Sequence, residues 1–314
     1  MRSPATAPLA EAQGAFCDLH RLIALRAAAE RLRLRPPPAR RGAPGAHAGT
    51  RRGRGIEFEE LRPYEAGDDI RAIDWRVTAR SGRVHTRVFR EERERPVFLL
   101  VDQRREMFFG SRRALKSVQA VHAAALLAWA ALAGGDRVGG LLIGEHGQHE
   151  VRPRRDHRTV LELLQSCTEF NHRLGIPGPA APAATLTPAF AALRRVVRPG
   201  AMVIVISDFA GWDADSAREL HLLGRHVEAC AIHVHDPLER ALPAAGVALA
   251  GDGERRVTLD CGDEPTRRRH REAFEHLSGA AARDFARIGA AFLALPTDAC
   301  ASGVLAAAFR GPAR

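Results

Sequence analysis

The chain has 314 residues, of which 46% are hydrophobic and 27% are charged, a balance that excludes a wholly disordered or fibrous protein. Its formal net charge of +10 is carried by arginine, because Lys116 is the only lysine. Such a preference for arginine, beside abundant alanine and glycine, follows codon composition, so the charge gives little support for a nucleic-acid partner.

The first third of the chain is polar and holds few predicted elements. Apolar residues recur at helical spacing in residues 16–34, which predicts a helix with one buried stripe. Three prolines at 36–38 end this helix, because proline lacks an amide donor and disfavours helix in the residue before it. Residues 40–55 have no apolar period and are a predicted linker. Residues 56–95 carry dense charge of both signs, and only 84–89 alternate as a half-buried strand does.

From residue 96 the pattern changes to apolar strands that alternate with helices. The strands at 97–102 and 201–208 are apolar throughout and end in Asp102 and Asp208. Strands that are apolar on both faces predict a mostly parallel sheet covered by helices on both sides. Further strands are predicted at 138–143, 227–234 and 291–295, and helices at 111–133, 155–167, 188–197, 214–223 and 266–288.

Ligands of such open sheets bind beyond the carboxyl ends of the strands, at the point where the strand order reverses. Asp102 and Asp208 are expected at that edge. No G-x-G-x-x-G follows a strand and no G-x-x-x-x-G-K-[ST] occurs, so neither dinucleotide nor P-loop chemistry is supported.

A charged cluster precedes the predicted sheet. Asp68, Asp69 and Asp74 lie among several arginines, close to Tyr64 and Trp75. The simplest interpretation is that these charges pair with one another and hold a loop around the two aromatic residues. The alternative is a metal or partner site made by the three aspartates, although no nucleophile or base accompanies them.

The same region resembles the signature of the domain-of-unknown-function 58 family. It reads G-x-G-x-E-F, then R-x-Y-x-x-G-D-D-x-R-x-I-D-W, then A-R, and closes with Glu91. A later D-P-L-E string at 236–239, with Leu242-Pro243 and Gly246, also fits, so the resemblance covers about residues 51–310. The residues that carry its first part are Gly53, Gly55, Glu57, Phe58, Arg62, Tyr64, Gly67, Asp68, Asp69, Arg71, Asp74, Trp75 and Arg80.

The resemblance implies a von Willebrand factor A-like α/β domain, which agrees with the strand–helix alternation. It also implies a protein that is commonly encoded beside a MoxR-type AAA+ ATPase and acts with it in assembling or maturing other proteins. The expected organisation is an N-terminal helix and linker at 1–50, a small charged β sub-module at 51–95 and the von Willebrand factor A-like domain at 96–314.

That fold usually carries a metal-ion-dependent adhesion site, made by D-x-S-x-S and by a threonine and an aspartate on later loops. On this chain the resemblance maps the first motif to Asp102, Arg104 and Glu106, so both serines are replaced. The remaining members map to Asp208 and to either Thr185 or Thr187.

Arg104 decides what this edge can bind. A guanidinium has no lone pair to offer a metal, and about 5 Å from a divalent ion it would repel the ion by roughly 6–7 kcal/mol at an effective dielectric of 20. Arg104 could turn inward, pair with Asp102 and Asp208 and stand where the metal would be. It could also point to solvent and leave Glu106 as a ligand. Because Mg²⁺ prefers six oxygen ligands, we expect no tightly bound metal.

Other polar residues suggest weaker candidates. His233 and His235 share a strand face, but two histidines do not complete a zinc site. Asp236 and Glu239 frame a proline and predict a capping box of a short helix. The remaining candidates are surface histidines, at His146, His149 and His157.

The cysteines and apolar runs indicate where the protein works. The five cysteines are odd in number and lack C-x-x-C spacing, which fits neither a disulfide framework nor a zinc site. The most apolar run, 123–133, is shorter than the roughly 20 residues that span a bilayer, and residues 1–14 do not have the pattern of a signal peptide. We expect reduced thiols, no transmembrane segment and a cytoplasmic protein.

The sequence therefore predicts a non-catalytic interaction module that binds partners through the carboxyl edge of its sheet, with the block at 53–80 as a second contact surface. Its expected partners are a MoxR-type AAA+ ATPase and a client protein, and no cofactor is expected. One alternative is a metal-dependent hydrolase, which lacks a recognisable base or nucleophile. The other is a nucleic-acid binder using the basic tract 51–55, which lacks interleaved aromatic residues for base stacking.

Overall fold

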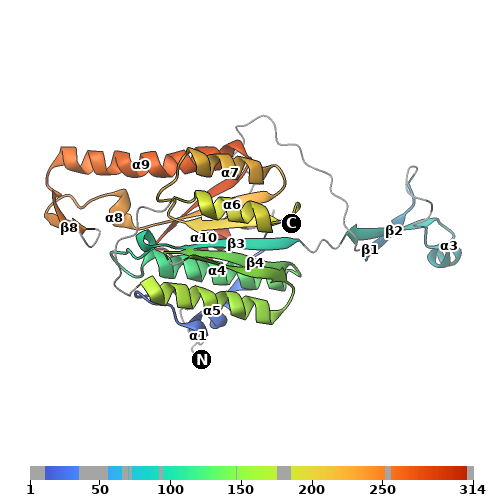
Figure 1. Cartoon of the computed structure of the whole chain (residues 1–314). Coiled ribbons are helices and arrows are strands. Elements are labelled where there is room, and N and C mark those ends of the chain that lie inside the picture. The colour runs from blue at the N-terminus through green and yellow to red at the C-terminus, as the bar shows by residue number, and fades with distance from the viewer. Residues whose placement is uncertain are drawn as a thin grey trace, which may run out of the picture. The chain divides into compact units, whose positions relative to one another are not determined.

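The computed structural model describes residues 11–34, 56–65, 70, 73–91, 95–145, 147–174, 185–251 and 256–309. The chain divides into two compact units. The smaller is His47–Glu94, and the larger combines Met1–Ala46 with Arg95–Arg314. Figure 1 shows both units and labels many of their elements.

In its described part, the larger unit is built on a six-stranded sheet in the order β10-β7-β6-β3-β4-β5. Neighbouring strands are parallel except β4 and β5, which pair antiparallel at one edge. This is the doubly wound order, and its switch point lies between β3 and β6. The predicted mostly parallel sheet is confirmed. Its strands are β3 (Pro96–Gln103), β4 (Arg137–Gly144), β5 (Gly147–Arg154), β6 (Met202–Ser207), β7 (Glu228–His235) and β10 (Ala291–Pro296).

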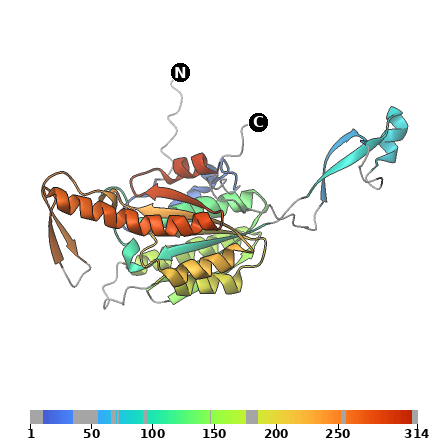
Figure 2. The same ribbon diagram turned by 90° about the horizontal axis from the view of Figure 1, so that it is seen from above.

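Helices cover both faces of this sheet, as Figures 1 and 2 show, and one hydrophobic core lies on each face. Along β3, Val97, Leu99 and Val101 join one core, whereas Phe98 and Leu100 join the other, because successive side chains of a strand point to opposite faces. The helices of the first face are α1 (Leu19–Ala24), α2 (Arg26–Ala29), α4 (Lys116–Ala133), α5 (His157–Leu174) and α10 (Ala301–Ala308). Those of the second face are α6 (Thr187–Val196), α7 (Ala214–Gly224) and α9 (Glu264–Arg287).

Helix α4 is the central helix of the first core. By length and composition alone it could cross a membrane, but 89% of it is buried inside the protein. It lies between the sheet and the N-terminal segment, and Trp129 at its far end donates to the carbonyl of Leu22. An alanine-rich helix buried all round is what such a sandwiched position requires.

Several predicted boundaries are wrong. The helix expected at 16–34 begins only at Leu19, because Asp18 caps it by accepting from the Arg21 N–H, and it is divided into two short helices. The helix expected from residue 111 begins at Lys116, because Ser111 donates instead to Asp236. The helix expected at 155–167 runs on to Leu174.

Other elements have no counterpart among the predicted ones. Edge strand β5 is mostly exposed and polar, so its residues lack the apolar alternation of a half-buried strand. The elements that the sequence did not predict also include the β8–β9 hairpin, α10, α3 and β1. The remaining bounds are β1 (Ile56–Pro63), α3 (Trp75–Ser81), β2 (His85–Glu91), the 3₁₀ helix η2 (Arg105–Met107), α8 (Pro237–Arg240), β8 (Val247–Gly251) and β9 (Arg256–Asp260).

Candidate functional site

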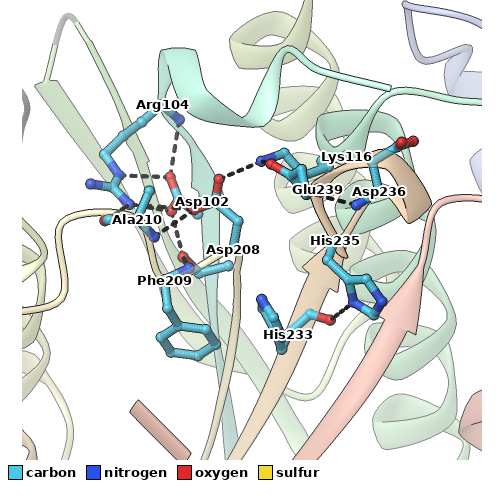
Figure 3. Close-up of polar contacts among 11 residues, drawn as sticks. Asp102, Arg104, Lys116, Asp208, Phe209, Ala210, His233, His235, Asp236 and Glu239 are labelled. Atoms are coloured by element: carbon cyan, nitrogen blue, oxygen red, sulfur yellow. Dashed lines mark hydrogen bonds and ion pairs between the residues drawn. The ribbon is translucent and has the colours of Figure 1, made fainter. Parts of the chain in front are cut away.

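The two predicted aspartates meet at the carboxyl edge of the sheet. Asp102 lies near the end of β3, and Asp208 follows β6, the strand beside it. Both carboxylates are buried. Because these strands flank the switch point, the strand order brings the two side chains together as expected (Figure 3).

Arg104 turns inward onto both carboxylates. Its Nε donates to Asp102 Oδ1 at 3.0 Å and its Nη2 to Asp102 Oδ2 at 2.8 Å, while Nη2 lies 3.9 Å from Asp208 Oδ1. Burial alone would lower the pKa of Arg104, but the carboxylates, Asp102 foremost, raise it above its ordinary value. The guanidinium is therefore a fixed charge in the interior, and it takes the inward of the two orientations that the sequence left open.

The turn after β6 is shaped to receive Arg104. Phe209 has a φ of 59°, in the left-handed region that bulky residues rarely adopt. Next to it, the N–H of Ala210 donates to Asp208 Oδ1 and its carbonyl accepts from Arg104 Nη2, both at 2.9 Å. The strained turn thus places one donor and one acceptor into the network.

Lys116 is a second buried cation, which the sequence interpretation missed. Its Nζ donates to Asp208 Oδ2 at 2.7 Å and to Glu239 Oε1 at 2.6 Å, and the side chain is only 2% exposed. Burial alone would lower the pKa of Lys116, but the charges of Asp208 and Glu239 raise it above its ordinary value. A lone lysine in an arginine-rich chain is the signal that could have identified it.

A third buried carboxylate, Asp236, lies at the end of β7. It directly follows β7, is fully buried, and accepts from the Ser111 and Thr297 hydroxyls at 2.5 and 2.6 Å. Burial would raise the pKa of Asp236, but these hydrogen bonds hold it below the ordinary value. Its N–H donates to Glu239 Oε2 at 2.8 Å and its carboxylate accepts from the Leu238 N–H, so the predicted capping box is confirmed.

The predicted threonine position does not lie at this network. Thr187 Oγ1 donates to Asp213 Oδ1 at 3.0 Å and lies 3.0 Å from Ser216 Oγ, so it ties α6 to the start of α7. Thr185 is exposed, and its hydroxyl accepts from the Thr187 N–H. Glu106, on η2, is partly exposed and is one of the charges that raise the pKa of Arg104.

We therefore expect Thr187→Val to lower the free energy of unfolding by about 1 kcal/mol, the usual contribution of one hydrogen bond. Urea denaturation measures this change, with Thr258→Val, at an exposed position of β9, as the control that stays within about 0.5 kcal/mol. A chain that loses several kcal/mol with Thr187→Val would show that the hydroxyl does more than join the two helices.

The divalent metal that the family resemblance implies does not fit this donor set. Asp102 Oδ1 accepts from the N–H and Nε of Arg104, and Asp102 Oδ2 accepts from Arg104 Nη2 and the Ser207 hydroxyl. The two oxygens of Asp208 accept from the Ala210 N–H and from Lys116. Within the described ranges, no three His, Cys, Asp or Glu side chains gather as a metal site.

The two histidines of β7 lie beside this network but are kept neutral. The rings of His233 and His235 stack 5.1 Å apart and lie within 5.6 Å of Phe274. Burial lowers the pKa of His233 to about 4 and also lowers that of His235. Of the three histidines expected at the surface, His149 and His157 are exposed, and His146 lies outside the described residues.

We expect the free energy of unfolding to fall as the pH is lowered from about 6.5 toward 4. In this window an unfolded chain protonates its histidines, while His233 in the folded chain stays neutral. The unfolded state then binds more protons, so acid favours it by about 1.4 kcal/mol per pH unit for each such histidine. Urea denaturation at several pH values should show a shallower slope for His233→Phe than for wild type. Equal slopes in the two proteins would contradict the assignment.

The family-signature residues of the smaller unit are only partly within the described residues. Asp74 caps α3 by accepting from the Arg76 and Val77 N–H groups, which supports a structural role for that carboxylate. Trp75 is 65% exposed, so it is not the centre of a closed loop, as the charge cluster had suggested.

The other signature residues have varied positions. Arg62 lies 3.6 Å from Glu65, Tyr64 is partly exposed and Arg80 is exposed. Glu57 and Phe58 lie on β1. Those outside the described residues are Gly53, Gly55, Gly67, Asp68, Asp69 and Arg71.

The chain is similar in sequence to a protein family and to individual proteins. The family model described as "Protein of unknown function DUF58" matches residues 60–283. Uncharacterized proteins of Mycobacterium tuberculosis and Mycobacterium bovis are each 33% identical over 261 residues, which cover 81% of this chain and 78% of the relative.

Solved structures are similar at lower levels. BatB from Bacteroides thetaiotaomicron aligns with this chain at a TM-score of 0.43 and 12% sequence identity. An aerotolerance-related membrane protein from Bacteroides fragilis aligns at a TM-score of 0.46 and 13% sequence identity. Each comparison covers 68% of this chain and 96% of the other. The von Willebrand factor A domain of SpRpn10 aligns at a TM-score of 0.33 and 10% sequence identity, and the alignment covers 68% of this chain and 94% of that domain.

Proposed function

The chain belongs to the DUF58 family, and from this premise we propose that it is a non-catalytic protein-interaction module whose partner binds at the carboxyl edge of the sheet. The implied partner is a MoxR-type AAA+ ATPase, with which it would act in the assembly or maturation of a client protein. One observation carries the proposal. The carboxylates of this edge are already neutralised by Arg104 and Lys116 in a buried network.

A closed network of this kind suits a binding surface better than a reaction centre. General acid–base chemistry needs a group that exchanges a proton near neutral pH. Here burial would raise the pKa of Asp208, yet the charge of Lys116 holds it below the ordinary value, while Arg104 and Lys116 keep raised pKa values. These groups hold their charges, and their ion pairs fix the loops that follow β3 and β6.

Exposed apolar side chains border the network. Phe109 is 42% exposed, and its ring centroid lies 5.9 Å from Lys116 Nζ. Leu238, next to Glu239, is 36% exposed, and Arg112 and Arg240 are exposed nearby in the sequence. Aromatic residues and arginine are enriched at protein interfaces, so this composition supports docking at the edge.

The smaller unit supplies the proposed second contact surface. Ile70 and Trp75 are both largely exposed there, and a large aromatic side chain in water is a common binding anchor. A metal-dependent hydrolase gains less support, because Asp74, Asp102 and Asp208 are all engaged in structural hydrogen bonds or ion pairs.

The test measures the affinity of the immobilised full chain for a purified MoxR-type ATPase from the same genome, with ATP, with ADP and without nucleotide. We expect the double variant Phe109→Ala, Leu238→Ala to weaken binding by about tenfold or more, as the loss of interface anchors does. The matched control is Ile23→Ala, Leu161→Ala, which removes two exposed aliphatic side chains on α1 and α5. Equal affinity of a folded edge variant and wild type would refute the proposed interface.

A further inference from the structure

Lys116 stands apart from every other basic side chain of the protein. It is the only lysine in a chain that otherwise uses arginine. An ammonium is a compact point charge with three donors, whereas a guanidinium is a planar fork that needs more room. A lysine kept at a buried position therefore indicates that the compact ammonium itself is required there.

The two carboxylates on Lys116 differ in how firmly they are held. Asp208 is buried, and it is also bound by the Ala210 N–H and lies near Arg104. Glu239 is 29% exposed and belongs to α8, a helix of four residues. Figure 3 shows Lys116 between the two. One carboxylate is thus a fixed part of the interior, and the other reaches in from the surface.

Glu239 occupies a site with two donors. Its Oε1 accepts from Lys116 Nζ at 2.6 Å, and its Oε2 accepts from the Asp236 N–H at 2.8 Å. A side-chain ammonium and a backbone N–H that converge on one carboxylate are a complete receptor for that group. Any carboxylate that displaced Glu239 would find both donors in place.

We propose that Lys116 and the Asp236 N–H form a binding site for an acidic side chain of the partner, and that Glu239 is the internal occupant which this side chain displaces. The inference rests on the proposed function, whose interface it narrows to one contact. The exchange leaves no buried charge unpaired, because Asp208 stays on Lys116 and Glu239 moves into water. One carboxylate replaces another, so net affinity comes from apolar contacts with Phe109 and Leu238.

Charge around the site favours an acidic partner. Among the charged side chains, the exposed ones nearest in sequence to the two apolar residues are Arg240 and Arg112, of which Arg112 also lies 3.1 Å from Asp298. Positive rims of this kind attract acidic segments and speed their association. A basic partner segment would meet these arginines and gain nothing from Lys116.

The experiment uses the single lysine as a reporter. When lysine is the only isotope-labelled residue type, Lys116 is the single labelled side chain of the full chain. Its NMR signal is followed during titration. The probe is the blocked tripeptide acetyl-Phe-Glu-Leu-amide, with acetyl-Phe-Gln-Leu-amide as its neutral counterpart. Glu239→Gln is the test variant, because glutamine keeps the oxygen that caps α8 but holds the ammonium less strongly.

We expect the Glu tripeptide to shift the Lys116 signal in Glu239→Gln with an affinity about fivefold tighter than in wild type, since the charged oxygen that accepts from Lys116 is replaced by an uncharged NH₂ group, which accepts no hydrogen bond. The Gln tripeptide should leave the signal in place. Glu228→Gln is the matched control, because Glu228 pairs with Arg95 at the opposite end of β7, and it should behave as wild type.

A Glu tripeptide that binds Glu239→Gln no better than wild type, or a Gln tripeptide that shifts the signal equally, would overturn the site. If the ATPase still requires Phe109 and Leu238 in that case, the proposed function stands and only the carboxylate contact fails. If neither the binding of the tripeptide nor the binding of the ATPase depends on this edge, both proposals are wrong.

Discussion

Replacing Arg104 by methionine is expected to lower the free energy of unfolding by about 3–5 kcal/mol. The substitution leaves Asp102 with the Ser207 hydroxyl and a backbone N–H as donors, but with no cation beside it. A buried carboxylate without a counter-charge is among the most costly features in a protein interior. Urea denaturation at neutral pH measures the loss.

Two further variants separate the ion pair from simple packing. Arg194→Met removes an exposed guanidinium that pairs with Glu219 and should cost about 1 kcal/mol or less. The double variant Asp102→Asn, Arg104→Met removes both charges and should be more stable than Arg104→Met alone. A loss below about 1 kcal/mol for Arg104→Met would show that Asp102 does not depend on this cation.

Lys116→Met is expected to cost about 3 kcal/mol at neutral pH, because Asp208 then keeps only the more distant Arg104 as a cation. Lys116→Arg should also destabilise, by about 1–3 kcal/mol, since a guanidinium overfills a position packed for an ammonium. A Lys116→Arg variant with the same free energy of unfolding as wild type would show that the compact ammonium is not required.

The pH dependence of the Lys116→Met effect follows from two pKa directions. The lowered pKa of Asp208 contributes stability above its unfolded value of about 3.9, and this is lost as the pH falls through the folded pKa. The raised pKa of Lys116 contributes stability that is lost as the pH rises through its folded value, above about 10.4. The difference between wild type and variant should therefore be flat near neutrality and narrow at both extremes, as denaturation curves across pH would show.

The architecture could be predicted from the sequence where burial leaves a pattern. The strands around Asp102 and Asp208 are apolar on both faces, so their identity, direction and common edge follow from composition alone. Strand β5 is polar and exposed, and the β8–β9 hairpin carries exposed aliphatic side chains such as Leu249. Such elements differ little from loops in their hydrophobic pattern, and the sequence did not predict them.

The chemistry of the site could be predicted only in part. The resemblance implies that Arg104 stands where a metal-binding motif has a serine, but the sequence left both an inward and an outward orientation of Arg104 possible. What turns the side chain inward is the Ala210 carbonyl together with the Asp102 carboxylate, and the first belongs to a turn 106 residues away. The partners of Lys116 lie 92 and 123 residues away, beyond the reach of any local motif.

Two side-chain cations, Arg104 and Lys116, balance the carboxylates at this edge, and we infer that no divalent ion binds there. A titration of the full chain with Mn²⁺, in which electron paramagnetic resonance follows the free ion, tests it most directly, with Asp102→Asn measured in parallel. We expect the wild-type chain to have no saturable Mn²⁺ site that is lost in Asp102→Asn. One tightly bound Mn²⁺ per chain that disappears with Asp102→Asn would contradict it.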